Sequence, residues 1–194
     1  VDGGSLLAGF DEHGPPLHLG PPASPIDRDD DPFAWHETDP LPPRSTGRRR
    51  RLDVSLDGDV ARIDSWFRDT HVDAHGVETV VHEYTVRAIV DRSSGRFVHS
   101  EAEPGPLPYV ECPGAAASAG RLVDLPVDGL RDRVSAAFTG PSTCTHLNDA
   151  FRSLEDLQDL ISSLETLDDG PSRSDGARRR RHDEGRHTDA EERA

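Results

Sequence analysis

The order of two hydrophobic periodicities constrains this chain more than any other feature. Apolar and polar residues alternate along four consecutive stretches, at 51–57, 60–69, 79–91 and 96–103. A period of two residues is that of a β-strand with one buried face. Short connections separate the stretches, which predicts direct pairing of neighbouring strands. We therefore expect an antiparallel sheet of about four strands.

Two stretches with helical periodicity follow the predicted strands. In 127–138, and again from about 145 to 167, apolar residues recur three and four positions apart, as on one face of an amphipathic helix. A Gly-Pro pair follows each stretch and ends the helix. The segment from 104 to about 125 is rich in Gly, Pro and Ala and is predicted to be a loop. Strands followed by helices indicate an α+β fold, in which two C-terminal helices pack on one face of the sheet.

Composition divides the chain into one domain and two tails. Residues 1–47 are rich in proline and show neither period, and residues 168–194 are almost entirely charged or small. Segments with so little apolar surface cannot offset the conformational entropy that folding removes. We therefore expect a proline-rich, disordered tail at 1–47, a single α+β domain at 48–167 and a charged, disordered tail at 168–194.

The charged residues narrow the class of protein. The net charge is −15, and all 22 basic residues are arginine. A nucleic-acid-binding protein normally has a basic face, so we expect no nucleic-acid partner. No apolar run reaches the roughly 18 residues of a membrane-spanning helix, so we expect no membrane partner either. No stretch near Val1 resembles a secretory signal, which predicts a cytoplasmic location and reduced cysteines.

The densest cluster of reactive side chains lies where the second predicted helix begins. Cys144 and His146 stand two positions apart within the polar stretch 141–149. Unpaired N–H groups and the helix dipole at such a position favour an anion or a thiolate. The second cysteine, Cys112, lies in the predicted loop before the helices.

Three further polar residues fall on the apolar faces of predicted strands. His82 and Tyr84 share one face of the third strand, and Asp69 ends an apolar face of the second. If these residues meet at one end of the sheet, they form a binding site for a polar small molecule.

The reactive residues allow three interpretations. Cys112, Cys144 and His146, with His82, have the ligand types of a tetrahedral zinc site. Alternatively, Cys144 is a nucleophile and a histidine is its base. In the third interpretation the cluster is structural: a threonine caps the helix, Cys144 is a small buried apolar residue, and His146 binds a nearby carbonyl group.

Four short motifs together resemble a bacterial family, the domain of unknown function 2889. They are Phe67-Arg68-Asp69, Val81-His82-Glu83-Tyr84, Glu111-Cys112-Pro113 and the stretch from Cys144 to Asp149. The resemblance covers about residues 50–165 and leaves out both tails; its most specific part is Cys-Thr-His-Leu at the start of the last helix. Members of the family often have glycine before that cysteine, where this chain has Thr143. The resemblance implies that His82, Cys112, Cys144 and His146 belong together, and it implies no activity.

These observations predict a cytoplasmic bacterial protein with a pocket for a small molecule or for a metal such as zinc. The first alternative is an enzyme in which Cys144 or a bound metal reacts and His146 or His82 transfers protons. The second is a non-catalytic accessory protein that holds a partner through Phe33, Trp35 or the tails. The sequence leaves the reaction, the substrate and the oligomeric state open.

Overall fold

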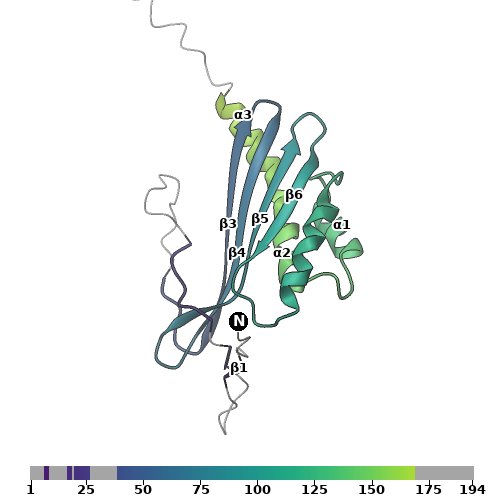
Figure 1. Cartoon of the computed structure of the whole chain (residues 1–194). Coiled ribbons are helices and arrows are strands. Elements are labelled where there is room, and N and C mark those ends of the chain that lie inside the picture. Colours follow the sequence, from purple (N-terminus) through teal and green to yellow (C-terminus); the bar gives the residue numbers. More distant parts are fainter. Residues whose placement is uncertain (1–6, 9–16, 19, 27–38, 169–194) are drawn as a thin grey trace, which may run out of the picture.

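The core of the fold is a four-stranded antiparallel sheet, as predicted (Figure 1). The structure is a computed structural model that describes residues 7–8, 17–18, 20–26 and 39–168. Strands that are consecutive in the chain are neighbours in the sheet. They are β3 (Ser45–Asp57), β4 (Val60–Val72), β5 (Glu78–Asp91) and β6 (Arg96–Pro104). Two short strands, β1 (Leu7–Ala8) and β2 (Leu17–His18), form a separate antiparallel pair.

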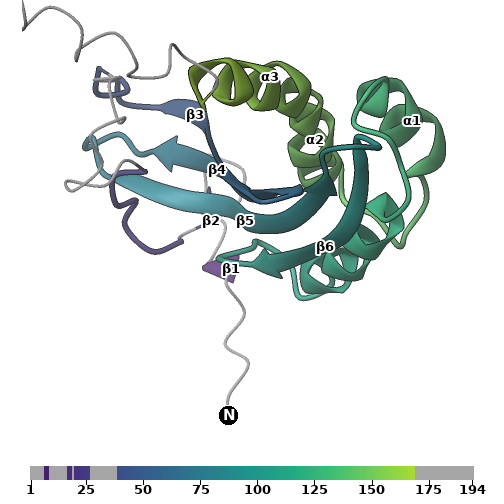
Figure 2. The ribbon, with the colours of Figure 1, turned by 90° about the horizontal axis from the view of Figure 1, so that it is seen from above.

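The helices follow the sheet and pack on one of its faces, which confirms the α+β fold (Figure 2). They are α1 (Leu130–Ala137), α2 (Thr145–Ser153) and α3 (Leu157–Asp168). The helix predicted from about 145 to 167 is divided, because the 3₁₀ turn η2 (Leu154–Asp156) separates α2 from α3. Residues three apart eclipse one another in a 3₁₀ turn, so Leu154 and Leu157 both face the core and are fully buried.

The segment after β6 is not the loop that its Gly and Pro content predicts. It contains the 3₁₀ helix η1 (Cys112–Leu122), with Pro113 in its first turn. Ala115, Ala119 and Leu122 are buried at spacings of three and four residues. These residues bury one face of the helix, a signal that the surrounding Gly and Pro obscured.

The hydrophobic core lies between the inner face of the sheet and the helices. The predicted alternation is confirmed, because the inward apolar residues of β4 and β5 and the apolar stripe of α2 are at most 4% exposed. They include Ala61, Ile63, Phe67, Tyr84, Val86, Ala88, Val90, Leu147 and Phe151. This packing fixes which side chains of β3, β4 and β5 point toward α2.

Part of the predicted N-terminal tail lies against the sheet. Two backbone hydrogen bonds, of 2.9 and 3.0 Å, join residues 21–23 to residues 78–80 of β5. A Cβ at Gly20 would lie 1.7 Å from the Val80 carbonyl oxygen, so this close approach requires glycine. Strand β3 already begins at Ser45, inside the predicted tail. The domain boundaries remain a prediction, but residues 20–26 and 45–47 pack with the sheet.

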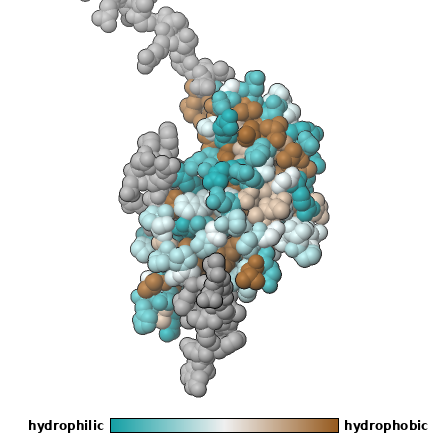
Figure 3. Space-filling model, in the orientation of Figure 1, coloured by the Kyte–Doolittle hydropathy of each residue, from teal (hydrophilic) through white to brown (hydrophobic). Residues whose placement is uncertain are grey.

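The surface is mixed in character. Figure 3 shows hydrophilic and apolar side chains interspersed, with the apolar ones gathered mainly toward the end of the sheet where α3 lies. Leu167 near the end of α3 is 78% exposed. Among the described residues, no helix has the length and apolar character needed to cross a membrane. Phe33 and Trp35, the predicted partner-binding residues, lie outside the described residues.

Candidate functional site

A row of three polar side chains crosses strands β3, β4 and β5 on the inner face of the sheet. Arg48 pairs in register with Asp69, and Asp69 pairs in register with His82. Directly paired residues point to the same face, so the three side chains are neighbours. The pairing of β4 with β5 shifts by one residue immediately after Asp69, a bulge of the kind often found beside functional sites.

Asp69 is held by a two-pronged contact with arginine. The Arg48 Nε and Nη2 atoms donate to the two Asp69 carboxylate oxygens at 2.7 and 2.8 Å. This bidentate geometry fixes the plane of the carboxylate as well as its position. The Asp69 Oδ2 atom is also 4.0 Å from Nδ1 of His82. The carboxylate therefore faces its histidine neighbour in a defined orientation.

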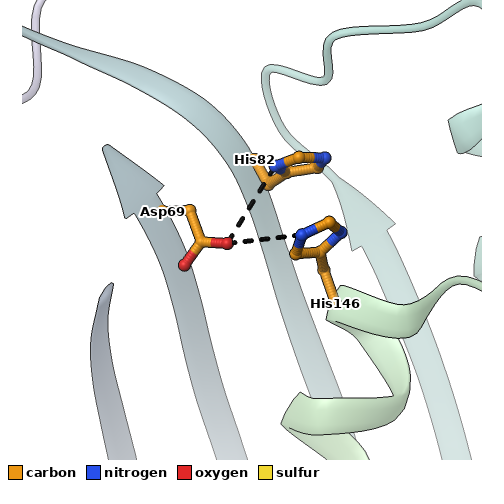
Figure 4. Close-up of side chains that lie close together, drawn as sticks. All are labelled: Asp69, His82 and His146. Atoms are coloured by element: carbon orange, nitrogen blue, oxygen red, sulfur yellow. Dashed lines mark ion pairs between the residues drawn. The ribbon is translucent and has the colours of Figure 1, made fainter. Parts of the chain in front are cut away.

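Helix α2 adds His146 to this row (Figure 4). The imidazole of His146 stacks on that of His82, with ring centroids 3.6 Å apart and an angle of 23° between the planes. Its Nε2 atom is 3.6 Å from Oδ2 of Asp69. Its other nitrogen, Nδ1, is 3.7 Å from Sγ of Cys144, the N-cap residue of α2. His146 thus lies between a thiol and a carboxylate.

Tyr84 occupies the next inward position of β5 and connects the two cysteines. Its side chain is fully buried, and its hydroxyl donates to the Cys112 carbonyl oxygen at 3.1 Å. Burial raises the pKa of Tyr84, and the nearby Cys144 thiol raises it further. Tyr84 is therefore a neutral hydrogen-bond donor at physiological pH. Burial also raises the pKa of Cys112.

Cys144 differs from Cys112 in its ionisation. Burial alone would raise the pKa of Cys144, but the hydrogen bond with His146, the backbone N–H groups of Leu147 and His146 and the Tyr84 hydroxyl together lower it to about 7. These N–H groups belong to the first turn of α2, where the helix dipole also favours negative charge. The pKa of Cys144 therefore lies well below the usual value of a cysteine, whereas that of Cys112 lies above it.

Asp149, on the next turn of α2, binds three arginines. Nη1 of Arg48 lies 2.9 Å and Nη2 of Arg152 lies 3.2 Å from its oxygens, and Arg50 also pairs with it. Burial opposes ionisation of Asp149, but the arginines, with Arg50 foremost, keep its pKa below the usual value. Through Asp149 the arginines of β3 are tied to the helix that carries Cys144 and His146.

The profile of one protein family covers this entire site. A family described as "Protein of unknown function (DUF2889)" matches residues 46–158, more than half of the chain. The chain belongs to this family. The resemblance predicted from the motifs is thereby confirmed, and the description of DUF2889 names no activity. Comparisons with curated proteins and with solved structures gave no match.

In this DUF2889 chain the structure brings together most of the residues proposed from the sequence. Asp69, His82, His146 and Cys144 form one contact network, and the Tyr84 hydroxyl lies next to the Cys144 thiol. Cys112 joins them through its carbonyl group, which binds Tyr84. Its role as a ligand remains a prediction.

The arginines of β3 were not predicted as part of the DUF2889 site. Arg48 and Arg50 stand at the same parity as Leu52 and Val54, whose side chains face the core cluster. The signal that could have predicted them is therefore that two polar residues continue the apolar face of this strand. Their position in a run of four arginines, at 48–51, obscured it.

Asp69, His82 and His146 are also a candidate set of metal ligands. One donor atom from each lies within 4.8 Å of the others. Zinc binds nitrogen at about 2.0–2.1 Å, so two imidazoles on one tetrahedral ion have ring centres about 5 Å apart. The observed separation of 3.6 Å means that the rings would have to move apart to bind one ion. Cys144 faces Nδ1 of His146, whereas Asp69 faces Nε2.

Three grooves on the described surface lie away from these residues. They have volumes of about 340, 230 and 330 Å³. The first two are lined mainly by polar residues of the sheet such as Asp53, Asp64 and Arg87, and the third lies between the turn after β5 and helix α3. The pocket expected at the cysteines and histidines of DUF2889 remains a prediction.

Proposed function

We propose that this DUF2889 chain is a cysteine-dependent enzyme that hydrolyses or transfers acyl groups. The observation that carries the proposal is the position of His146, with Nδ1 3.7 Å from the Cys144 sulfur and Nε2 3.6 Å from the Asp69 carboxylate. Nucleophile, base and carboxylate follow one another in this order in a catalytic triad. Such contacts are commonly long in sites without substrate and shorten when substrate binds.

Each member of the triad has one task in the reaction. A proton on Nε2 of His146 faces the Asp69 carboxylate, which leaves Nδ1 free to accept the thiol proton of Cys144. The thiolate attacks the carbonyl carbon: the S–C bond forms, the bond to the leaving group breaks, and Nδ1 gives its proton to the leaving group. Water then attacks the thioester, His146 takes a proton from that water, and the released thiolate receives it. The product is a carboxylic acid.

The neighbouring side chains support this chemistry by positioning the triad. Arg48 orients Asp69 through its bidentate contact, and His82 stacks on His146 and limits rotation of its ring. The Tyr84 hydroxyl, whose single proton the Cys112 carbonyl oxygen accepts, can turn that proton to the Cys144 sulfur once the thiolate forms. The cytoplasmic location expected from the sequence would keep this thiol reduced.

Acylation by p-nitrophenyl acetate tests the proposal. The chain contains no lysine, so side-chain amines that react with such esters are absent. We expect release of p-nitrophenol with acetyl accumulating on Cys144, located by peptide mass spectrometry, and no acetylation at this position in Cys144→Ser. The Cys112→Ser variant serves as the matched control and should react like the native chain. Equal acetylation of both cysteines, at the rate of a small free thiol, would overturn the proposal.

Metal binding is the competing proposal, favoured by the three donor atoms within 4.8 Å. It requires the stacked histidine rings to separate. Equilibrium dialysis of the native chain against zinc distinguishes the two proposals. Stoichiometric zinc uptake that is lost in both His82→Ala and Asp69→Asn would show that these residues form a metal centre and not a triad. Uptake that neither variant changes would exclude that metal centre.

A further inference from the structure

We infer that the substrate of this site carries a carboxylate near its acyl group, and that Arg50 with Arg48 binds it. The inference rests on the proposed cysteine-dependent function and adds the class of substrate. It concerns the three arginines around Asp149. These arginines take no direct part in the acyl-transfer steps.

The cluster beside Cys144 and His146 is locally positive in an acidic protein. Three guanidinium groups, of Arg48, Arg50 and Arg152, share two carboxylates, of Asp69 and Asp149. The chain as a whole has a net charge of −15. An excess of positive charge at this one position favours an anion there and raises its local concentration.

The arginines are more accessible than the carboxylates that they bind. The side chains of Arg48 and Arg50 are 44% and 41% exposed, whereas those of Asp69 and Asp149 are 15% and 21% exposed. A guanidinium group has five N–H donors. Among the described residues, Arg50 makes a side-chain hydrogen bond to Asp149 through Nη2 alone. Its remaining donors suit the two oxygens of an incoming carboxylate.

A purely structural role for Arg50 would be to tie β3 to α2 through Asp149. If that were its whole role, loss of Arg50 would change the reactivity of the thiol toward anionic and neutral reagents of the same shape by the same factor. The ratio of two alkylation rates therefore separates the two roles, because any change in the amount of thiolate cancels in the ratio.

The experiment measures alkylation of Cys144 by iodoacetate, which is anionic, and by iodoacetamide, which is neutral, in the Cys112→Ser chain. In both reactions the S–C bond forms and iodide leaves. Arg50→Gln in this chain should lower the iodoacetate-to-iodoacetamide ratio by about threefold or more, because it removes one positive charge from the cluster at Asp149, on the helix that carries Cys144. The ratio in the parent chain should also fall as salt is added, because ions screen the attraction.

Arg62→Gln is the matched control. Arg62 is a 55% exposed arginine of β4 in an ion pair with Asp57, on the outer face of the sheet, and its loss should leave the ratio unchanged. Suppose that Cys144 reacts rapidly with both reagents. An iodoacetate-to-iodoacetamide ratio that is the same in Arg50→Gln as in Arg62→Gln would then overturn the inference. Slow reaction of Cys144 with both reagents, as slow as a free thiol, would instead contradict the proposed cysteine-dependent function.

Discussion

His82 and His146 stack with their ring centroids 3.6 Å apart, although one belongs to strand β5 and the other to helix α2. The stack fastens the start of α2 to the sheet at the point where His146 meets Cys144. His82→Ala should therefore lower the free energy of unfolding by about 1–2 kcal/mol, whereas His82→Phe, which preserves an aromatic ring, should lower it by about half as much or less. Urea unfolding of the two variants measures the difference. Equal losses would show that the stack contributes nothing of its own.

Replacement of His146 should change the ionisation of Cys144. His146→Ala removes the side-chain hydrogen bond that lowers the pKa of Cys144, while burial, which raises it, remains. The pH of half-maximal alkylation of Cys144 should then rise by about one unit or more. His99→Ala is a suitable control, because His99 lies on β6, is 52% exposed and is paired with Glu101. If the Cys144 thiol titrates alike in His146→Ala and His99→Ala, His146 is not the partner of the thiol.

Tyr84→Phe should affect both stability and the thiol. The variant leaves the Cys112 carbonyl oxygen without the hydroxyl that now donates to it at 3.1 Å, which should cost about 1 kcal/mol of unfolding free energy. It also removes the hydroxyl that can instead donate to the Cys144 thiolate and thereby lower the pKa of Cys144, so that pKa should rise. Urea unfolding and the alkylation profile measure the two effects. An unchanged alkylation profile would show that Tyr84 does not influence the thiol and acts only as a core residue.

Much of the fold could be predicted because period-two alternation and burial coincide. Ala61, Ile63 and Phe67 face the core as expected, and so do the helix residues Leu147 and Phe151. The division between α2 and α3 could not be predicted, because the apolar stripe continues through the 3₁₀ turn. The packing of residues 20–26 against β5 depends on backbone hydrogen bonds, which have no signature in side-chain periodicity.

The candidate site could be predicted in its residue types but not in its geometry. Asp69 and His82 fell on the expected faces, and Cys144 stands at the helix N-terminus as expected. That His146 turns one ring nitrogen to the thiol and the other to Asp69 depends on how α2 lies across the sheet. Arg48 entered the site because register, rather than composition, places it opposite Asp69.

The most direct test of the triad is the pH dependence of Cys144 alkylation by iodoacetamide in the Cys112→Ser chain. Only the thiolate reacts, so the rate rises with pH through the pKa of the thiol. Because contacts at the start of α2 lower the pKa of Cys144 to about 7, we expect the rate to reach half of its maximum near pH 7. A midpoint at about 8.5, the value of an unperturbed cysteine, or above it, would contradict the account.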